Sequence, residues 1–292
     1  MSAAPVLDTL PMTLPRLAEK KRLGEPIVMV TAYDHPSARV ADAAGVDLVL
    51  VGDSAANVVL GYDSTVPVSV DELIMLGRAV RRGLRTPFMV SDLPFGSYEA
   101  SDAQAIATAQ RFVKEAGADA VKLEGGGKMV DRARAIVEAG IPVMGHVGLT
   151  PQTATALGGY KAQGRTADAA LRVAEDALAL QAAGCFSIVF EAIPAAVSEE
   201  LMERMDEAVV IGIGAGAATD GQVLVFHDLL GIREGAGARF VKRYGDLMDE
   251  MVDGVTAYAD DVRAHRYPAP EHTYSIDPGE LADFRSRLGA AA

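Results

Sequence analysis

The sequence predicts a (β/α)8 barrel of the TIM type, built as a single domain with an N-terminal arm and a C-terminal helical extension. The chain has 292 residues, half of them hydrophobic, which is enough for one large core. A short Val/Ile-rich run followed by an Ala-rich helical stretch recurs along the chain. Only 5% of the residues are aromatic and Trp is absent, so small side chains dominate a core that suits helices packed closely on a parallel sheet.

Seven apolar runs are predicted to be strands, because each ends in a polar or Gly-rich turn and precedes a helical stretch. They are residues 26–34, 46–54, 86–94, 118–126, 141–148, 184–192 and 208–216. Strands that alternate with helices imply βαβ units and a parallel sheet. An eighth apolar run, 222–231, reads equally well as a strand or as a buried helix. Together they favour a closed barrel over an open doubly wound sheet.

The two ends of the chain differ from the repeating part. Residues 1–25 contain prolines and one short amphipathic helical stretch, and we expect them to form an arm. The barrel is expected over residues 26–264. Residues 265–292 are rich in turn formers and finish in a short helix, so they are predicted to be an extension.

Composition restricts the partners and the compartment. A net charge of −13 would repel nucleic acid and anionic membranes. The N-terminus lacks the apolar run of a signal peptide, and no apolar stretch reaches the roughly 18 residues of a membrane span. The single cysteine, Cys185, permits no internal disulfide and is expected to be a core residue rather than a nucleophile. We therefore expect a cytoplasmic protein that binds small molecules.

Acidic side chains stand at the ends of three consecutive predicted strands. Asp53, Asp92 and Glu124 come from strands that lie about 4.8 Å apart in a sheet, so their carboxylates can reach one point. Three such groups in one dry site require a cation, and ligands that are all oxygen favour Mg²⁺ over Zn²⁺. For each residue alone, the alternative is an N-cap of the following helix.

Three more side chains lie at predicted strand ends. Lys122 faces the same side as Glu124 and is expected to bind a substrate carboxylate, although it could be a structural partner of Glu124. Glu191 lies among apolar neighbours, which favour a general base, or it could cap a helix before Pro194. His146 is either a core histidine or a hydrogen-bond donor to a ligand.

A glycine-rich stretch, Gly212–Gly216, follows the seventh predicted strand. Its fit to a dinucleotide fingerprint is weak, because that pattern belongs in a first βαβ unit with an acidic partner about 20 residues on. The glycines are instead expected to let the backbone approach a ligand at the barrel mouth.

The chain resembles the ketopantoate hydroxymethyltransferase family from about Thr31 to Tyr274. The resemblance rests on long collinear motifs, namely TAYD (31–34), GDS (52–54), GYDST (61–65), SDLPF (91–95), VKLEGG (121–126), GHVGLTPQ (145–152), GGYKAQGR (158–165), FEAIP (190–194), IGIGAG (211–216) and DGQVLVFHDLLG (220–231). It implies an enzyme of pantothenate biosynthesis and a large homo-oligomer, typically a decamer.

The resemblance also implies the chemistry. The substrates would be 3-methyl-2-oxobutanoate and 5,10-methylenetetrahydrofolate, and the product 2-dehydropantoate, through an enolate stabilised by Mg²⁺. The implied roles are metal binding by Asp53, Asp92 and Glu124, substrate contacts from Asp53, Ser54, Asp92 and Lys122, and removal of the C3 proton by Glu191.

Two segments depart from the family pattern. Ala55–Asn57 stand where the family usually has Leu-Gly-Met, which puts the pocket shape in question, and residues 234–244 also diverge. A lyase or mutase of the phosphoenolpyruvate mutase/isocitrate lyase type is an alternative, but those enzymes carry a reactive loop cysteine whereas Cys185 lies in a predicted strand. A non-catalytic scaffold is a third possibility, in which the site acids would be expendable.

Overall fold

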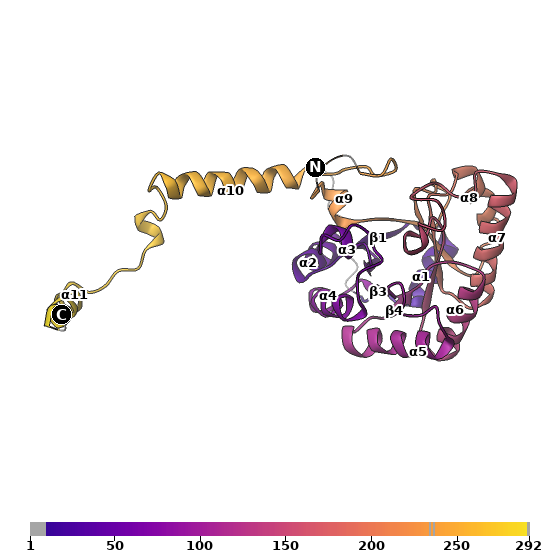
Figure 1. Cartoon of the computed structure of the whole chain (residues 1–292), viewed down its shortest axis with the longest axis horizontal. Helices are drawn as coiled ribbons and strands as arrows, with labels where there is room; N and C mark the ends of the chain where they lie inside the picture. Colours follow the sequence, from indigo (N-terminus) through magenta and orange to yellow (C-terminus); the bar gives the residue numbers. More distant parts are fainter. Residues whose placement is uncertain (1–9, 234, 236, 291–292) are drawn as a thin grey trace. The chain divides into compact units, whose positions relative to one another are not determined.

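Eight parallel strands close into a barrel in the order of the sequence, with β8 paired to β1. This confirms the predicted fold class. Figure 1 shows the computed structural model, in which helices such as α5, α6 and α7 lie around the outside of the strands. The strands are β1 (Ile27–Thr31), β2 (Leu48–Val51), β3 (Phe88–Asp92), β4 (Ala120–Lys122), β5 (Val143–Gly148), β6 (Ser187–Glu191), β7 (Val209–Ile213) and β8 (Gly221–Leu224).

Local signals in the sequence fix where several helices begin and end. Asp34 and Ser69 cap two helices with a capping box each, and Gly45 ends the first of them in the left-handed region with φ 71°. The helices of the barrel unit are α1 (Leu14–Leu23), α2 (His35–Ala44), α3 (Ala55–Val58), α4 (Val70–Gly83), α5 (Asp102–Arg111) with a π-helical continuation (Phe112–Ala116), α6 (Lys128–Glu138), a 3₁₀ turn (Pro151–Thr153), α7 (Ala167–Ala182), α8 (Ala195–Met202) and α9 (Phe226–Leu230).

The core has two layers, because each strand of a closed barrel is buried on both faces. One cluster fills the inside of the barrel and includes Met29, Leu48 and Met144. The other lies between the strands and the surrounding helices. Helix α1 belongs with the inner cluster through Leu17, which is 1% exposed, and its Lys20 pairs with Asp47 at 2.6 Å. The predicted helix of the arm therefore packs with the barrel instead of standing apart from it.

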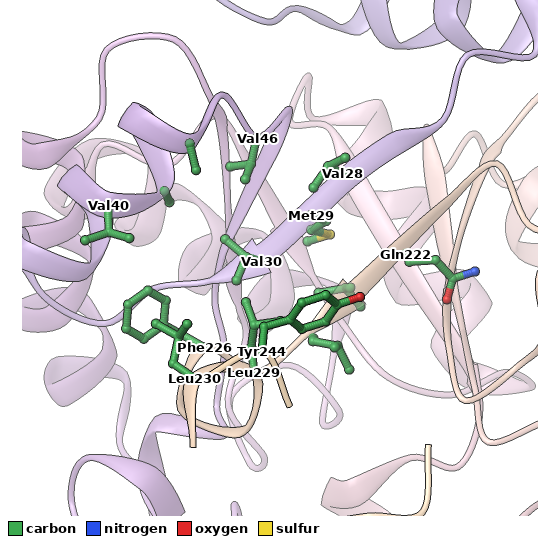
Figure 2. A pocket seen from close by; sticks show the side chains of 14 residues that line it. Val28, Met29, Val30, Val40, Val46, Gln222, Phe226, Leu229, Leu230 and Tyr244 are labelled. Carbon is green, nitrogen blue, oxygen red and sulfur yellow. The ribbon is translucent and has the colours of Figure 1, made fainter. Parts of the chain in front are cut away.

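The ambiguous eighth run contains both of the predicted elements. Strand β8 ends at Leu224, and the five-residue helix α9 follows directly. Beside them lies an apolar groove of about 430 Å³, lined by side chains of β1, α2, β8 and α9. Figure 2 shows Val28, Val40, Phe226 and Leu229 around this groove.

The structure describes residues 10–233, 235 and 237–290, so residues 1–9 of the predicted arm and two positions of the divergent segment lie outside it. The chain divides into two compact units, one ending at Tyr244 and one beginning at Gly245. The second unit contains α10 (Leu247–Arg263), a 3₁₀ turn (Pro270–His272) and α11 (Pro278–Ala290). Within the described part of this unit, neither α-helix has a buried residue. The division between the two units falls inside the range 26–264 that was predicted for the barrel.

Among the described residues, none of the helices combines the length and the apolar character that crossing a membrane requires.

Candidate active site at the carboxyl ends of the strands

The predicted site residues converge at one end of the barrel. Asp92, Lys122 and Glu191 are the last residues of β3, β4 and β6. Asp53 and Glu124 follow β2 and β4 by two residues, and His146 lies within β5. All of these and Ser54 line one enclosed cavity of about 170 Å³. The register brings Asp92 and Lys122 opposite each other on neighbouring strands.

The three carboxylates of the predicted metal site are deeply buried. Asp53, Asp92 and Glu124 are between 2% and 4% exposed. Asp92 Oδ2 accepts a hydrogen bond from the backbone N–H of Asp53 at 2.9 Å, which links the ends of β2 and β3. The N-cap residue of α3 is Ser54 and that of α5 is Ser101. The N-cap alternative for Asp53 and Asp92 is therefore wrong, and both carboxylates face the cavity instead.

Lys122 provides a positive charge inside this acidic cluster. Its Nζ lies 2.7 Å from Asp92 Oδ1 and 3.8 Å from Glu124 Oε1. Burial works against the charged form, but the nearby carboxylates outweigh it and hold the pKa of Lys122 above its ordinary range. The nearer partner of Lys122 is therefore Asp92, and Glu124, the partner that the sequence left open, lies farther away. Lys122 also lines the cavity.

The charge balance of the cluster favours a further cation. Burial, followed by repulsion from Asp92 and Glu124, raises the pKa of Asp53 well above its ordinary value. Among the described residues, no three His, Cys, Asp or Glu side chains are arranged as an assembled metal site. The donors nevertheless fit Mg²⁺ in chemistry, because three buried carboxylates offer only oxygen ligands and an excess of negative charge.

His146 connects the cluster to the predicted base. Its Nδ1 lies 3.3 Å from Glu124 Oε1, and its Nε2 lies 3.1 Å from Glu191 Oε2. Burial and Lys122 lower the pKa of His146, whereas Glu124 and Glu191 raise it, to about 9 overall. The two ring nitrogens therefore face two different carboxylates, although the contact of Nε2 with Glu191 does not have the geometry of a hydrogen bond.

Glu191 stands at the boundary between two cavities. Its side chain is 15% exposed and lines both the enclosed cavity and a larger outer cavity of about 1170 Å³. Helix α8 begins after Pro194, which is its N-cap residue. The capping alternative for Glu191 is therefore wrong. A carboxylate in this position can reach a molecule in either cavity.

Two further buried residues, Gln152 and Tyr98, hold the carboxylates in place. The Gln152 amide donates to Asp53 Oδ2 at 3.0 Å, and its backbone N–H donates to Glu124 Oε2 at 3.0 Å. The Tyr98 hydroxyl donates to Gln152 Oε1 at 2.7 Å and accepts from the backbone N–H of Glu124. Sequence reasoning missed both, although Gln152 closes the GHVGLTPQ motif, because its partners are distant along the chain.

The glycines of Gly212–Gly216 meet the chain itself. Gly214 has φ +64°, and a Cβ there would come within 2.5 Å of the Phe240 ring. Because Gly214 has no side chain, the Phe240 ring can pack against its backbone. Phe240 lines both cavities. The close approach predicted for a ligand is made by an aromatic ring of the chain.

The three residues that depart from the family pattern, Ala55–Asn57, lie differently with respect to the two cavities. Ala55 and Ala56 are fully buried in the outer core layer. Asn57 lines the outer cavity and donates to the Tyr62 carbonyl at 2.8 Å. The enclosed cavity is therefore bounded without these three residues, and only the outer one contains Asn57.

Comparison with known proteins places the chain in a family. The profile described as ketopantoate hydroxymethyltransferase matches residues 11–270. The chain belongs to the ketopantoate hydroxymethyltransferase family. A relative from Deinococcus radiodurans, named 3-methyl-2-oxobutanoate hydroxymethyltransferase, is 52% identical over 94% of this chain and 95% of the relative. One of the same name from Nitratidesulfovibrio vulgaris is 51% identical over 90% of this chain and 85% of the relative.

The family extends to plants, where a mitochondrial 3-methyl-2-oxobutanoate hydroxymethyltransferase 1 of Arabidopsis thaliana is 48% identical over 95% of this chain and 82% of the relative. As a member of the ketopantoate hydroxymethyltransferase family, the chain is an enzyme of the transferase class. The non-catalytic scaffold is thereby set aside.

Solved structures share the fold at much lower identity. A phosphonopyruvate hydrolase, in complex with oxalate and Mg²⁺, has a TM-score of 0.57 and 12% identity over 96% of this chain and 98% of that one. A phosphoenolpyruvate phosphomutase from Streptomyces platensis has a TM-score of 0.57 and 16% identity over 94% and 98%. At this low identity, these likenesses show a shared barrel fold and no more.

Proposed function

We propose that this enzyme transfers a hydroxymethyl group to 3-methyl-2-oxobutanoate and forms 2-dehydropantoate for pantothenate synthesis. The one-carbon donor is 5,10-methylenetetrahydrofolate. The names of the relatives support the acceptor. The observation that carries the mechanism is the position of Glu191, a carboxylate at the boundary between a small acidic cavity and a larger one.

The enclosed cavity suits the α-keto acid. At about 170 Å³ it is smaller than the roughly 300–1,000 Å³ of a site for a drug-sized ligand. Lys122 gives the substrate carboxylate a cation, and the Ser54 hydroxyl, which is 2.8 Å from the Tyr33 hydroxyl, is a polar contact on the same wall. Asp53, Asp92 and Glu124 would hold Mg²⁺, with the first two also beside the substrate. When bound, the metal supplies Lewis-acid stabilisation of the enolate oxygen.

Glu191 removes the proton from C3 of the bound keto acid. His146, 3.1 Å from Glu191 Oε2, orients the carboxylate for this step. The one-carbon unit enters from the outer cavity on its carrier. Water adds to the methylene carbon of the donor, both C–N bonds break, and the two protons of the water pass to the nitrogens of the departing tetrahydrofolate. C3 then bonds to the carbon of the formaldehyde so formed, and the carbonyl oxygen becomes the hydroxyl by taking back the proton that Glu191 removed from C3. We also propose that the enzyme is cytoplasmic and assembles as a homodecamer. Sedimentation analysis measures the number of subunits directly.

The test is product formation from 3-methyl-2-oxobutanoate and a donor labelled with ¹³C in its methylene group. We expect 2-dehydropantoate one mass unit heavier than the unlabelled product, with no product after chelation or without donor. Labelled product at an undiminished rate in the presence of a chelator would remove the metal from the mechanism. Cleavage of a carbon–carbon bond in place of transfer would favour the lyase alternative.

A further inference from the structure

The outer cavity has chemistry that the reaction at C3 does not use. Its volume of about 1170 Å³ exceeds the usual size of a site for a drug-sized ligand. It meets the enclosed cavity at Ser54, Glu191 and Phe240, which line both. The outer cavity therefore offers a second substrate a path to Glu191.

Four cationic side chains and three acidic ones, Asp63, Glu191 and Asp228, line the outer cavity, so cations are in excess there although the chain as a whole carries a net charge of −13. Lys161 and Arg165 come from the loop between β5 and α7, and Arg233 and Arg239 follow α9. Arg233 is paired with Asp228 at 2.5 Å. In the part of the chain that the structure describes, the other three have no carboxylate within ion-pair distance.

Aromatic surface lies in the same cavity. Tyr160 is 60% exposed and directly precedes Lys161. Phe240 is 36% exposed, follows Arg239, and rests on Gly214, where a side chain would collide with its ring. Exposed aromatic faces offer a flat ring system a stacking surface, and arginines beside them bind carboxylates.

We infer that the outer cavity binds the one-carbon donor and that Lys161, Arg165 and Arg239 bind the carboxylates of its tail. This inference rests on the proposed function. Its consequence is a preference for donors that carry several carboxylates, because each additional carboxylate can form a charge-assisted contact with a further cation of the cavity. In an acidic protein, these cations also offset the repulsion that a polyanionic substrate meets on approach.

The test compares the KM for methylenetetrahydrofolate with a single glutamate with the KM for the same donor with a tail of five glutamates, in which the additional four are γ-linked. For the unaltered enzyme we expect the longer tail to lower KM by about five- to twentyfold, the range for a few exposed charge-assisted contacts. The double variant Arg165→Gln/Arg239→Gln should raise KM for the longer tail and remove most of this difference. Both side chains are exposed, so the fold should tolerate the change.

Arg82→Gln is the matched control, since Arg82 is an exposed arginine in α4 that lines neither cavity. It should keep the full dependence on tail length. Equal KM values for the two donors with the unaltered enzyme would overturn the inference and leave the proposed function standing. A double variant that still discriminates between the tails would also overturn it. Absence of product with either donor would refute the proposed function itself.

Discussion

Gln152 makes hydrogen bonds to two carboxylates of the cluster, those of Asp53 and Glu124. Replacing it with leucine should lower both the free energy of unfolding and the affinity for Mg²⁺. The substitution keeps the volume but removes the amide, which leaves Asp53 Oδ2 and the Leu93 carbonyl without a donor and Tyr98 without its acceptor. Each buried polar group without a partner costs about 1–3 kcal/mol. The Tyr98 hydroxyl keeps a longer contact with the Glu124 carbonyl, so we expect a loss of about 3–5 kcal/mol in the free energy of unfolding.

The assay is urea denaturation in a chelating buffer, followed by calorimetric titration with Mg²⁺. Metal affinity should fall about 10- to 100-fold, as it does when residues that orient metal ligands are removed. Gln181→Leu is the control, because this half-buried amide also makes several hydrogen bonds, to Arg204, Asp206 and the backbone around Ala208, but far from the cluster. It should lose stability and keep its metal affinity. A Gln152→Leu variant with unchanged stability and affinity would refute the reasoning.

Three more predictions concern single side chains. Asp92→Ala removes a partner of Lys122 and should weaken Mg²⁺ binding at least about tenfold in calorimetry; unchanged affinity would exclude Asp92 from the ligands. Lys122→Met leaves buried carboxylates unpaired, so Tm in a chelator should fall and excess Mg²⁺ should restore part of the loss; an unchanged Tm would contradict this. Cys185 is 4% exposed, and burial raises the pKa of its thiol to about 12. A thiol reagent should therefore modify it only after unfolding. Fast modification of the native enzyme would contradict this prediction.

The sequence was sufficient for the fold and for the positions of the site residues. Because strand ends in a barrel face one mouth, the order of Asp53, Asp92, Lys122 and Glu191 along the chain predicted their convergence. The eighth run was ambiguous, since four strand residues and a five-residue helix follow each other too closely for periodicity to separate them.

The contacts that orient these residues could not be predicted. Gln152 reaches Asp53 across 99 positions of the chain, and Tyr98 reaches Gln152 across 54. The two contacts of His146 with carboxylates depend on the directions of side chains from three different strands or the residues just after them.

The central claim is that Glu191 takes the C3 proton of the keto acid in a site that requires the acidic cluster. Exchange of that proton into heavy water, followed by NMR with Mg²⁺ and without a folate, measures this step alone. We expect exchange with the unaltered enzyme and with Glu199→Gln, an exposed acid of α8. Exchange should disappear in Glu191→Gln and after chelation. Exchange that persists in Glu191→Gln at the original rate would contradict the account.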